Sequence, residues 1–369
     1  MTAAKLSEKK LKKSALAITK NVLDIKQDER VLIITNPSRD VLTISTAIYN
    51  SCLKTSAKPV ICIQQRKTQV DFMEKIVRKA IETEPEVVMS ISELKLGKDE
   101  EALVNPYIVN GKEYTNIFDA YMAMKKIRTI WTPGITREIF ERAVDIDYAK
   151  MRSDAEKLAK MFEGAESVRI QSKNGTDVEI GIAGRKAKKD DGNYSTPGTG
   201  GNIPAGEVYL SPAIEKTNGI VVVDGSISTY WGDVVTERPV KVEFRDGFGE
   251  KITGGKDAKL LQKSIAITRN KVKEMEKNGK FDRDKAEIYM KNATHLGEIG
   301  IGLNHSAIIS GNMLEDEKVY GTCHLAIGAN YDEDAPALNH YDCLIKKPTI
   351  CLLRKGEWIP IMKNGVLKI

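Results

Sequence analysis

The run RVLIIT at residues 30–35 decides the fold of the first third of the chain. It is short and continuously apolar, and two runs of the same kind follow at residues 59–63 (PVICI) and 86–91 (EVVMSI). Short apolar strands that alternate with helices are typical of βαβ units, whose parallel sheet is buried between layers of helices. The helical patterns lie at residues 5–24, 41–53 and 70–81. We therefore predict an α/β domain with a mainly parallel sheet over residues 1–145.

The pattern changes after about residue 145. A helical pattern at residues 148–162 precedes segments in which apolar and polar residues alternate, and turn signals such as Asn174-Gly175 and Asp224-Gly225 separate these segments. The alternating segments are residues 167–171, 177–182, 219–223 and 240–244. We predict that residues 146–369 form a second, α+β domain.

Composition and cysteine usage favour a cytoplasmic protein. A chain of 369 residues fits two domains, and with 41% hydrophobic residues it can bury a core without disulfides. The five cysteines are scattered and form no CxxC, which argues against a disulfide framework or a zinc ribbon. No apolar run approaches the ~18 residues of a membrane span, and no apolar segment of a secretory signal follows the basic start of the sequence. We expect neither secretion nor a membrane partner.

The net charge of +6 raises the question of a nucleic-acid partner. Much of the charge comes from the first 20 residues and from RKAKK at residues 185–189, which Asp190 and Asp191 follow directly. Aromatic residues that would stack on bases do not interleave with these cations. The pattern predicts a solvated basic face and no nucleic-acid partner.

All four histidines lie between residues 295 and 340, which is the first indication of a functional site. The sharpest motif is His340-Tyr341-Asp342, because residues i and i+2 of a strand project to the same face. An imidazole and a carboxylate on one face are ligands suited to zinc, cobalt, manganese or iron. Taken alone the motif is weak, since a surface turn can contain it equally well.

Three more residues stand in surroundings that predict burial. His324 lies in an apolar run between glycines, and a buried imidazole needs a hydrogen-bond partner or a metal. Glu207 and Glu298 lie in segments rich in glycine and isoleucine or valine, where a carboxylate is costly unless it pairs with a Lys or Arg or binds a metal. Together with His340 and Asp342 they give five candidate ligands, which suits two adjacent divalent ions.

Other catalytic motifs are missing from the sequence. It contains no HExxH, no GxSxG and no GxGxxG after the first strand, and Gly249–Lys256 matches a P-loop poorly because Glu250 and Asp257 stand where the motif needs Gly and Ser or Thr. Cys323 and Cys343 flank the proposed ligands, and we expect them to pack beside the metal rather than to react.

The residues around these motifs resemble the aminopeptidase T/aminopeptidase S family of metallopeptidases, with this chain as a short member of the archaeal type. The resemblance covers residues 130–345 and is carried jointly by four blocks. These are Gly201–Glu207 (GNIPAGE), Leu296–Glu298 (LGE), Asp316–Tyr331 with its DEK and HLAIG elements, and His340–Asp342 (HYD).

The resemblance implies a cytoplasmic homodimeric aminopeptidase that cleaves peptides with a free N-terminus. It implies two divalent ions per chain (zinc, cobalt or manganese), whose shared water attacks the first peptide bond. The implied metal ligands are Glu207, Glu298, His324, His340 and Asp342, with Glu317 as an acidic neighbour of the metals. Glu298, as the bridging carboxylate, and Tyr331 are the implied catalytic residues.

Two alternatives stay open. The sequence also has a distant likeness to the ring-cleaving 2,5-dihydroxypyridine dioxygenases, which share this scaffold and use one iron. Their two-histidine, one-carboxylate triad corresponds to His324, His340 and Asp342. A metal-binding protein without catalysis is the third possibility. The segment between Tyr331 and His340 is shorter than in bacterial aminopeptidases, and it is expected to border the substrate pocket.

Overall fold

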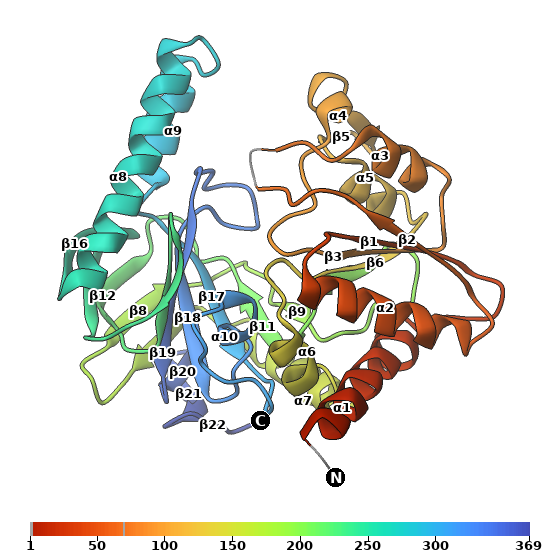
Figure 1. Ribbon diagram of the computed structural model, residues 1–369. Coiled ribbons are helices and arrows are strands. Elements are labelled where there is room, and N and C mark those ends of the chain that lie inside the picture. Colours follow the sequence, from red (N-terminus) through yellow and green to blue (C-terminus); the bar gives the residue numbers. More distant parts are fainter. Residues whose placement is uncertain (1–2, 69–70) are drawn as a thin grey trace. The chain divides into compact units, whose positions relative to one another are not determined.

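The computed structural model describes residues 3–68 and 71–369, and its contacts divide the chain into two compact units (Figure 1). The first unit contains Met1–Arg152 and Asp190–Ala205, and the second contains Ser153–Lys189 and Gly206–Ile369. Both units are therefore discontinuous in sequence, unlike the continuous segments 1–145 and 146–369 that we expected. The reason is that Gly200–Asn202 returns as an edge strand to the sheet of the first unit.

A parallel sheet forms the centre of the first unit. Its strand order is β10-β6-β3-β1-β2, and every pair of neighbours is parallel. The strands are β1 (Arg30–Thr35), β2 (Lys58–Ile63), β3 (Val87–Ile91), β6 (Arg128–Trp131) and β10 (Gly200–Asn202). The predicted α/β fold with a parallel sheet is thus confirmed.

Helices cover both faces of this sheet (Figure 1). They are α1 (Ala3–Ala17), the π-helical turn η1 (Ile18–Val22), α2 (Arg39–Leu53), α3 (Lys75–Glu82), α4 (Glu100–Val104), α5 (Ile117–Ala123) and α6 (Arg137–Ala143), with a small hairpin of β4 (Tyr107–Val109) and β5 (Lys112–Tyr114). The helix expected at residues 70–81 begins only at Lys75, and residue 70 itself lies outside the described residues. Its start is displaced because Phe72 forms a β-bridge with Lys98.

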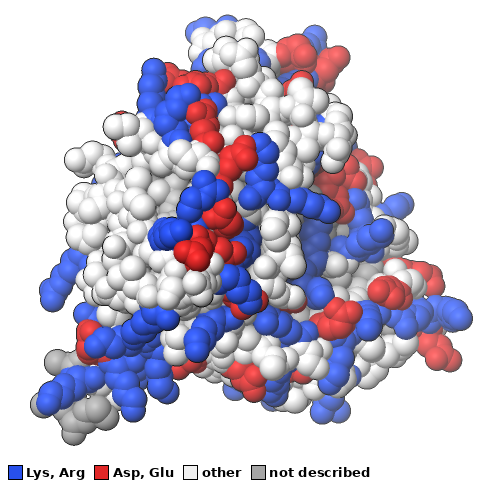
Figure 2. All heavy atoms as spheres, turned by 90° about the vertical axis from the view of Figure 1, so that its right-hand side faces the viewer, with Lys and Arg blue, Asp and Glu red and all other residues white. Residues whose placement is uncertain are grey.

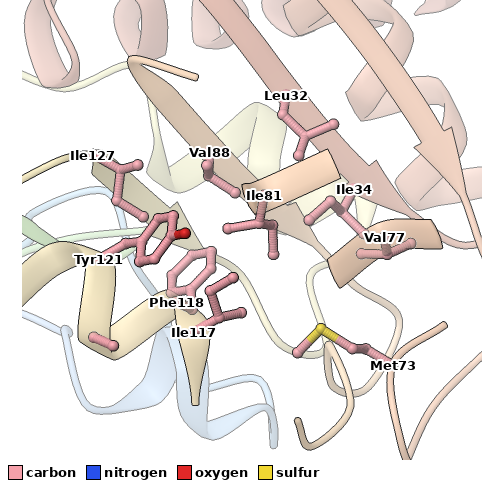
Figure 3. Packing of buried hydrophobic residues seen from close by; sticks show 11 residues of the cluster. Leu32, Ile34, Met73, Val77, Ile81, Val88, Ile117, Phe118, Tyr121 and Ile127 are labelled. Carbon is pink, nitrogen blue, oxygen red and sulfur yellow. The ribbon is translucent and has the colours of Figure 1, made fainter. Parts of the chain in front are cut away.

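The core between the sheet and helices α3 and α5 shows why these elements form (Figure 3). Leu32 and Ile34 are two residues apart on β1 and therefore project to the same face, where Val77 and Ile81, one turn apart on α3, pack against them. Phe118 and its neighbours on α5 complete the cluster. Full burial of each such side chain contributes roughly 1.5–3 kcal/mol, so this contact fixes the α3 and α5 face of the sheet.

Antiparallel sheets form the second unit. One has the order β14-β13-β19-β18-β17-β11-β9, and we call it the site sheet. Its strands are β9 (Lys188–Asp190), β11 (Glu207–Leu210), β13 (Ser226–Thr229), β14 (Gly232–Val235), β17 (Leu296–Gly302), β18 (Thr322–Gly328) and β19 (His340–Lys346).

The second sheet has the order β16-β15-β12-β8-β7-β20-β21-β22. Its strands are β7 (Ser167–Gln171), β8 (Asp177–Gly181), β12 (Thr217–Val223), β15 (Val240–Arg245), β16 (Phe248–Thr253), β20 (Thr349–Arg354), β21 (Glu357–Lys363) and β22 (Val366–Leu367). The helices are α7 (Tyr148–Phe162), which begins in the first unit, α8 (Lys256–Lys277), α9 (Arg283–Asn292) and the short α10 (Met313–Asp316). In the described part of the chain, no helix combines the length and the apolar character that crossing a membrane requires.

Basic side chains gather on α1. Lys5, Lys9, Lys12 and Lys13 line a groove between α1 and α2, and Lys12 pairs with Glu8 at 3.2 Å. Figure 2 shows a face of the molecule on which blue and red side chains lie interleaved over much of the surface. A mixed, solvated surface of this kind agrees with the charge pattern of the sequence, and the exclusion of a nucleic-acid partner stays a prediction.

Buried His295 makes the stability of the second unit depend on pH. The side chain is 1% exposed, its ring lies 5.4 Å from the ring of Phe248, and burial lowers its pKa to about 4. In the unfolded chain the pKa is about 6.5. Between these values the unfolded chain binds a proton that the folded chain does not, so stability is lost as the pH falls from about 6.5 to about 4.

We expect this histidine to contribute a slope of up to about 1.4 kcal/mol per pH unit in that window. His295→Gln removes the titrating group at similar volume and should flatten the slope by that amount. Urea unfolding of the two proteins at pH 7.5, 6.0 and 5.0 measures it. Equal slopes for both proteins would show that His295 is not the group responsible.

Candidate metal centre

One face of the site sheet carries the side chains that the sequence singled out. Residues that pair directly across antiparallel strands share a face, and the register pairs His324 with Gly300, Asp342 with Ala326, and Glu207 with Gly302. The resulting site face consists of Glu207 and Tyr209 from β11, Glu298, Gly300 and Gly302 from β17, His324, Ala326 and Gly328 from β18, and His340 and Asp342 from β19. Four neighbouring strands thus supply the ionisable groups, and small residues between them leave space.

A β-bulge at Gly297 places Glu298 on this face. Leu296 pairs with Ile327 and Glu298 pairs with Ala326, so β17 has one residue more than β18 at this point. If the regular pairing continued from Leu296 without the bulge, Glu298 would oppose Leu325 and project to the other face. Only glycine fits at the bulge, because a Cβ on Gly297 would lie 2.2 Å from the carbonyl oxygen of Ala329.

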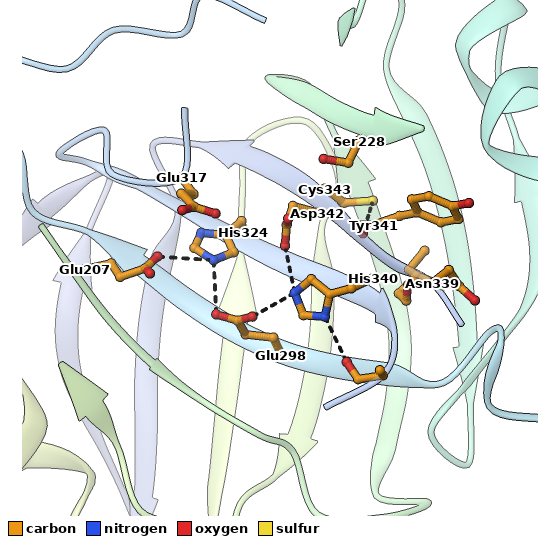
Figure 4. A network of polar contacts seen from close by, with 12 residues as sticks. Glu207, Ser228, Glu298, Glu317, His324, Asn339, His340, Tyr341, Asp342 and Cys343 are labelled. Atoms are coloured by element: carbon orange, nitrogen blue, oxygen red, sulfur yellow. Dashed lines mark hydrogen bonds and ion pairs between the residues drawn. The ribbon is translucent and has the colours of Figure 1, made fainter. Parts of the chain in front are cut away.

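Glu298 lies between the two imidazoles (Figure 4). Its Oε1 is 3.4 Å from His324 Nε2, and its Oε2 is 3.0 Å from His340 Nε2. Glu207 Oε2 is 3.6 Å from His324 Nε2, and Asp342 Oδ1 is 3.4 Å from His340 Nε2. All these groups therefore approach one another from four strands.

The structure brings all six residues that the sequence offered as metal ligands into one cluster. They form three overlapping groups whose ligand atoms lie within 4.8 Å of one another: Glu207, Glu298 and His324; Glu298, His340 and Asp342; Glu317, His324 and Asp342. Imidazoles and carboxylates that lie this close to one another form a set of ligands suited to divalent metal ions.

The state of the imidazoles fits a metal as well. His340 Nδ1 donates a hydrogen bond to the carbonyl oxygen of Ala329 at 2.9 Å, which leaves Nε2 as the nitrogen that faces the cluster. His324 is 1% exposed, and its Nδ1 has no hydrogen-bond partner among the described residues. An imidazole with an unsatisfied buried nitrogen and a second nitrogen facing carboxylates is poised for a ligand that this chain does not provide.

Lys318 is the residue that the sequence analysis did not assign. Its side chain is fully buried, and its Nζ lies 2.5 Å from Glu207 Oε1 and 2.7 Å from Glu317 Oε1. The sequence did allow that Glu207 pairs with a Lys or Arg, and that interaction is present. The cluster therefore has two ends, one that contains a lysine ammonium and one, around His340 and Asp342, that does not.

Burial and mutual contacts set the protonation of the cluster. Burial raises the pKa of Glu207 to about 8 against the opposing charge of Lys318, and burial also raises the pKa of Glu317. Burial acts in the same direction on Glu298, but hydrogen bonds from His324 and His340 outweigh it and lower its pKa to about 2. Burial lowers the pKa of His324, but Glu298 and Glu207 outweigh it, so that the pKa is about 9. Protons thus occupy sites that a divalent ion would take over on binding.

Tyr331 lies beside the cluster, next to His340. Its ring centroid is 5.1 Å from the His340 ring and 5.4 Å from the Tyr209 ring. Partial burial, together with the negative charges of Glu298 and Asp342, raises the pKa of its hydroxyl. Lys188 Nζ holds the segment in place by donating to the carbonyl oxygen of Tyr331 at 2.9 Å. The side chain is half exposed and so can contact a bound substrate.

Comparison with known protein families shows which family has this sequence pattern. The family model described as NicX, 2,5-dihydroxypyridine 5,6-dioxygenase, matches residues 16–352. The chain belongs to this family. The search of curated proteins found no match. The dioxygenase likeness, which we expected to be the more distant of the two, is therefore the better supported, while the metallopeptidase likeness is supported only as a shared fold.

Two solved structures have the same fold. The 2,5-dihydroxypyridine dioxygenase from Pseudomonas putida KT2440 aligns over 100% of this chain and 98% of its own, with a TM-score of 0.70 and 14% identity. Wild-type AmpT from Thermus thermophilus aligns over 98% of this chain and 100% of its own, with a TM-score of 0.62 and 16% identity. At such identities the two likenesses show the fold alone and leave the reaction to be argued from the site.

Gly300 is required for the His324 ring to lie on the sheet. A Cβ at this position would be 2.1 Å from both Cε1 and Nε2 of His324. We expect Gly300→Ala to displace the ring, to weaken metal binding at least ten-fold and to cost about 1–3 kcal/mol of stability. Calorimetric metal titration and urea unfolding measure the two effects.

A double-mutant cycle isolates the cause. In a His324→Ala background the ring is gone, so the same Gly300→Ala change should cost less than about 1 kcal/mol. An equal cost in both backgrounds would mean that the glycine serves the backbone of β17 and not the imidazole.

Proposed function

We propose that this chain is a dioxygenase that opens a hydroxylated, nitrogen-containing aromatic ring with a single iron ion. His324, His340 and Asp342 would hold the metal, with Glu298 as a neighbouring carboxylate. The observation that carries the proposal is the buried ammonium of Lys318 between Glu207 and Glu317. Membership of the 2,5-dihydroxypyridine 5,6-dioxygenase family supports the same reaction.

Lys318 disfavours a second metal ion. Its ammonium already lies against the two carboxylates that such an ion needs at this end of the cluster. A divalent ion about 4 Å from an ammonium is repelled by roughly 8 kcal/mol at an effective dielectric constant of about 20. The other end has no such cation, and Asp342 belongs both to the group with His340 and to the group with His324. An ion held by Asp342 would draw one imidazole from each of these two groups.

The chain's own residues favour a flat substrate. Two histidines and one carboxylate would leave coordination positions open on an iron ion. A bound iron ion of this kind would supply the reaction with oxygen that non-haem iron oxygenases carry out. Tyr331 and Tyr209 form an edge-to-face pair beside His340, with interplanar angles of 68° between the two tyrosines and 57° between Tyr331 and His340. Aromatic rings at this position provide a surface against which a planar ring packs.

A two-metal aminopeptidase is the second candidate. The observation in its favour is that Glu298 contacts both imidazoles and is shared by two of the ligand groups, as a bridging carboxylate requires. The fold shared with AmpT supports it further. In that case Tyr331 would stabilise the oxyanion of a peptide with a free N-terminus.

Metal content and substrate distinguish the two candidates. We expect protein reconstituted anaerobically with Fe²⁺ to bind one ion per chain and to consume oxygen when 2,5-dihydroxypyridine is added. It should not release p-nitroaniline from leucine p-nitroanilide with zinc, cobalt or manganese. Two ions per chain together with hydrolysis of the anilide would establish the aminopeptidase instead.

Removal of the Lys318 charge tests the physical basis of the proposal. Lys318→Met keeps most of the side-chain volume and frees Glu207 and Glu317, so the metal stoichiometry should rise from one to two per chain. Lys346→Met changes an exposed lysine at the end of the same strand that carries His340, and it should leave the stoichiometry at one. Wild-type protein that already binds two ions with Lys318 in place would contradict the argument from repulsion.

A further inference from the structure

A cavity of about 330 Å³ lies in the first unit, at the carboxyl ends of β3 and β6. Ser90 and Ser92 line it from β3 and its end, and Trp131 and Pro133 from β6 and its end. Ligands of open parallel sheets bind outside the carboxyl ends of the strands. The volume is that of a site for a small molecule of about one ring.

Its walls combine an aromatic surface with hydrogen-bonding groups. Trp131 and Phe118 form an edge-to-face pair at 6.0 Å, and Trp131 packs on the core cluster that contains Phe118. The buried hydroxyls of Ser90 and Ser92 bond to each other at 2.8 Å. Asn116 lines the wall, and its Oδ1 accepts from Phe118 N, which leaves its amide N–H groups for another acceptor.

Lys95 and Lys98 lie at the rim of the cavity, on a backbone segment that several hydrogen bonds hold in place. The segment that carries Lys95 and Lys98 is held by four hydrogen bonds: Lys95 N to Lys67 O at 3.0 Å, Lys98 N to Asp71 O at 2.9 Å, Met73 N to Lys98 O at 3.0 Å, and Gln64 Nε2 to Leu96 O at 2.8 Å. A Cβ on Gly97 would lie 2.6 Å from Met73 N, so the segment packs directly on its neighbour. The ammonium groups are therefore presented from a rigid edge.

The charges of these lysines are not used within the unit. In the described part of the chain, neither Lys95 nor Lys98 forms a side-chain ion pair, whereas Lys67 pairs with Glu74 at 2.6 Å and Arg78 pairs with buried Asp99 at 3.0 Å. Asp119 also lines the cavity and offers a carboxylate. The cavity thus presents two cations, a flat aromatic wall and one acceptor for a donor group.

We propose that this cavity binds a small aromatic carboxylic acid that carries a hydroxyl group on its ring. The carboxylate of the ligand pairs with Lys95 and Lys98, its ring packs against Trp131, and its hydroxyl donates to Asp119. Charge-assisted hydrogen bonds at one end and a single neutral donor at the other fix the orientation of the ring. The residues involved are distinct from the metal cluster, so the inference does not rest on the proposed reaction.

The experiment uses 4-hydroxybenzoate as the probe and Trp131 as the reporter. The chain has three tryptophans, and Trp231→Phe with Trp358→Phe leaves Trp131 as the single one in the full-length protein. We expect saturable quenching of its fluorescence by 4-hydroxybenzoate. Benzoate, which lacks the hydroxyl, and phenol, which lacks the acid, should each bind at least ten-fold more weakly.

Variants assign each end of the ligand. Lys95→Gln with Lys98→Gln should weaken 4-hydroxybenzoate at least ten-fold and abolish its advantage over phenol. Asp119→Asn should abolish the advantage of 4-hydroxybenzoate over benzoate. Lys173→Gln with Lys277→Gln, two exposed lysines of the second unit, is the matched control and should change nothing.

Three results would overturn the proposal: no saturable change at Trp131, equal losses in the rim and control variants, or binding that is lost in His324→Ala but kept in the rim variant. The last result would assign the ligand to the metal centre. Failure of the dioxygenase assay alone leaves these binding measurements unaffected, so the two proposals fail separately.

Discussion

The second unit must stabilise a group of charged side chains on the site face. Glutamates and an aspartate from neighbouring strands are brought together with two imidazoles, largely out of water, and such a set is unstable unless each charge has a partner. Lys318 meets that need at one end, where it contacts Glu207 and Glu317. At the other end the imidazoles contact Glu298 and Asp342. The sheet must therefore keep four strands in register, and the glycines between the ligands make their close approach possible.

Much of the fold was predictable because hydrophobic patterns are local. The apolar runs at residues 30–35, 59–63 and 86–91 became parallel strands, and the alternating segments became strands β7, β8, β12 and β15. β10 was not predictable, because Gly200–Asn202 carries neither an apolar run nor an alternation. It pairs with β6 mainly through backbone groups, with one further bond from the Asn202 amide to the carbonyl oxygen of Trp131, and a backbone pairing leaves no trace in the order of side chains. The discontinuous units follow from that one strand.

The members of the site were predictable for a different reason, namely that a charged or imidazole side chain in an apolar, glycine-rich run must serve a purpose. Glu207, Glu298 and His324 stand out in the sequence for this reason, and strand periodicity adds His340 and Asp342. The sequence pattern has limits here. It could not give the face of Glu298, which depends on the bulge at Gly297, because periodicity breaks at a bulge. It also missed Lys318, since a lysine next to Glu317 in a polar stretch resembles any surface residue until its burial is known.

The return of β10 to the first unit has a consequence for how the chain can be divided. The backbone passes from one unit to the other after Arg152, after Lys189 and again after Ala205, so neither unit is a contiguous piece of the gene. A fragment that ends at Arg152 would leave the backbone groups of β6 bare along one side, and an exposed strand edge recruits other chains. A domain insertion or a circular permutation is compatible with this architecture only at certain loops. The segment from Asp190 to Ala205 must stay attached to the chain at both of its ends.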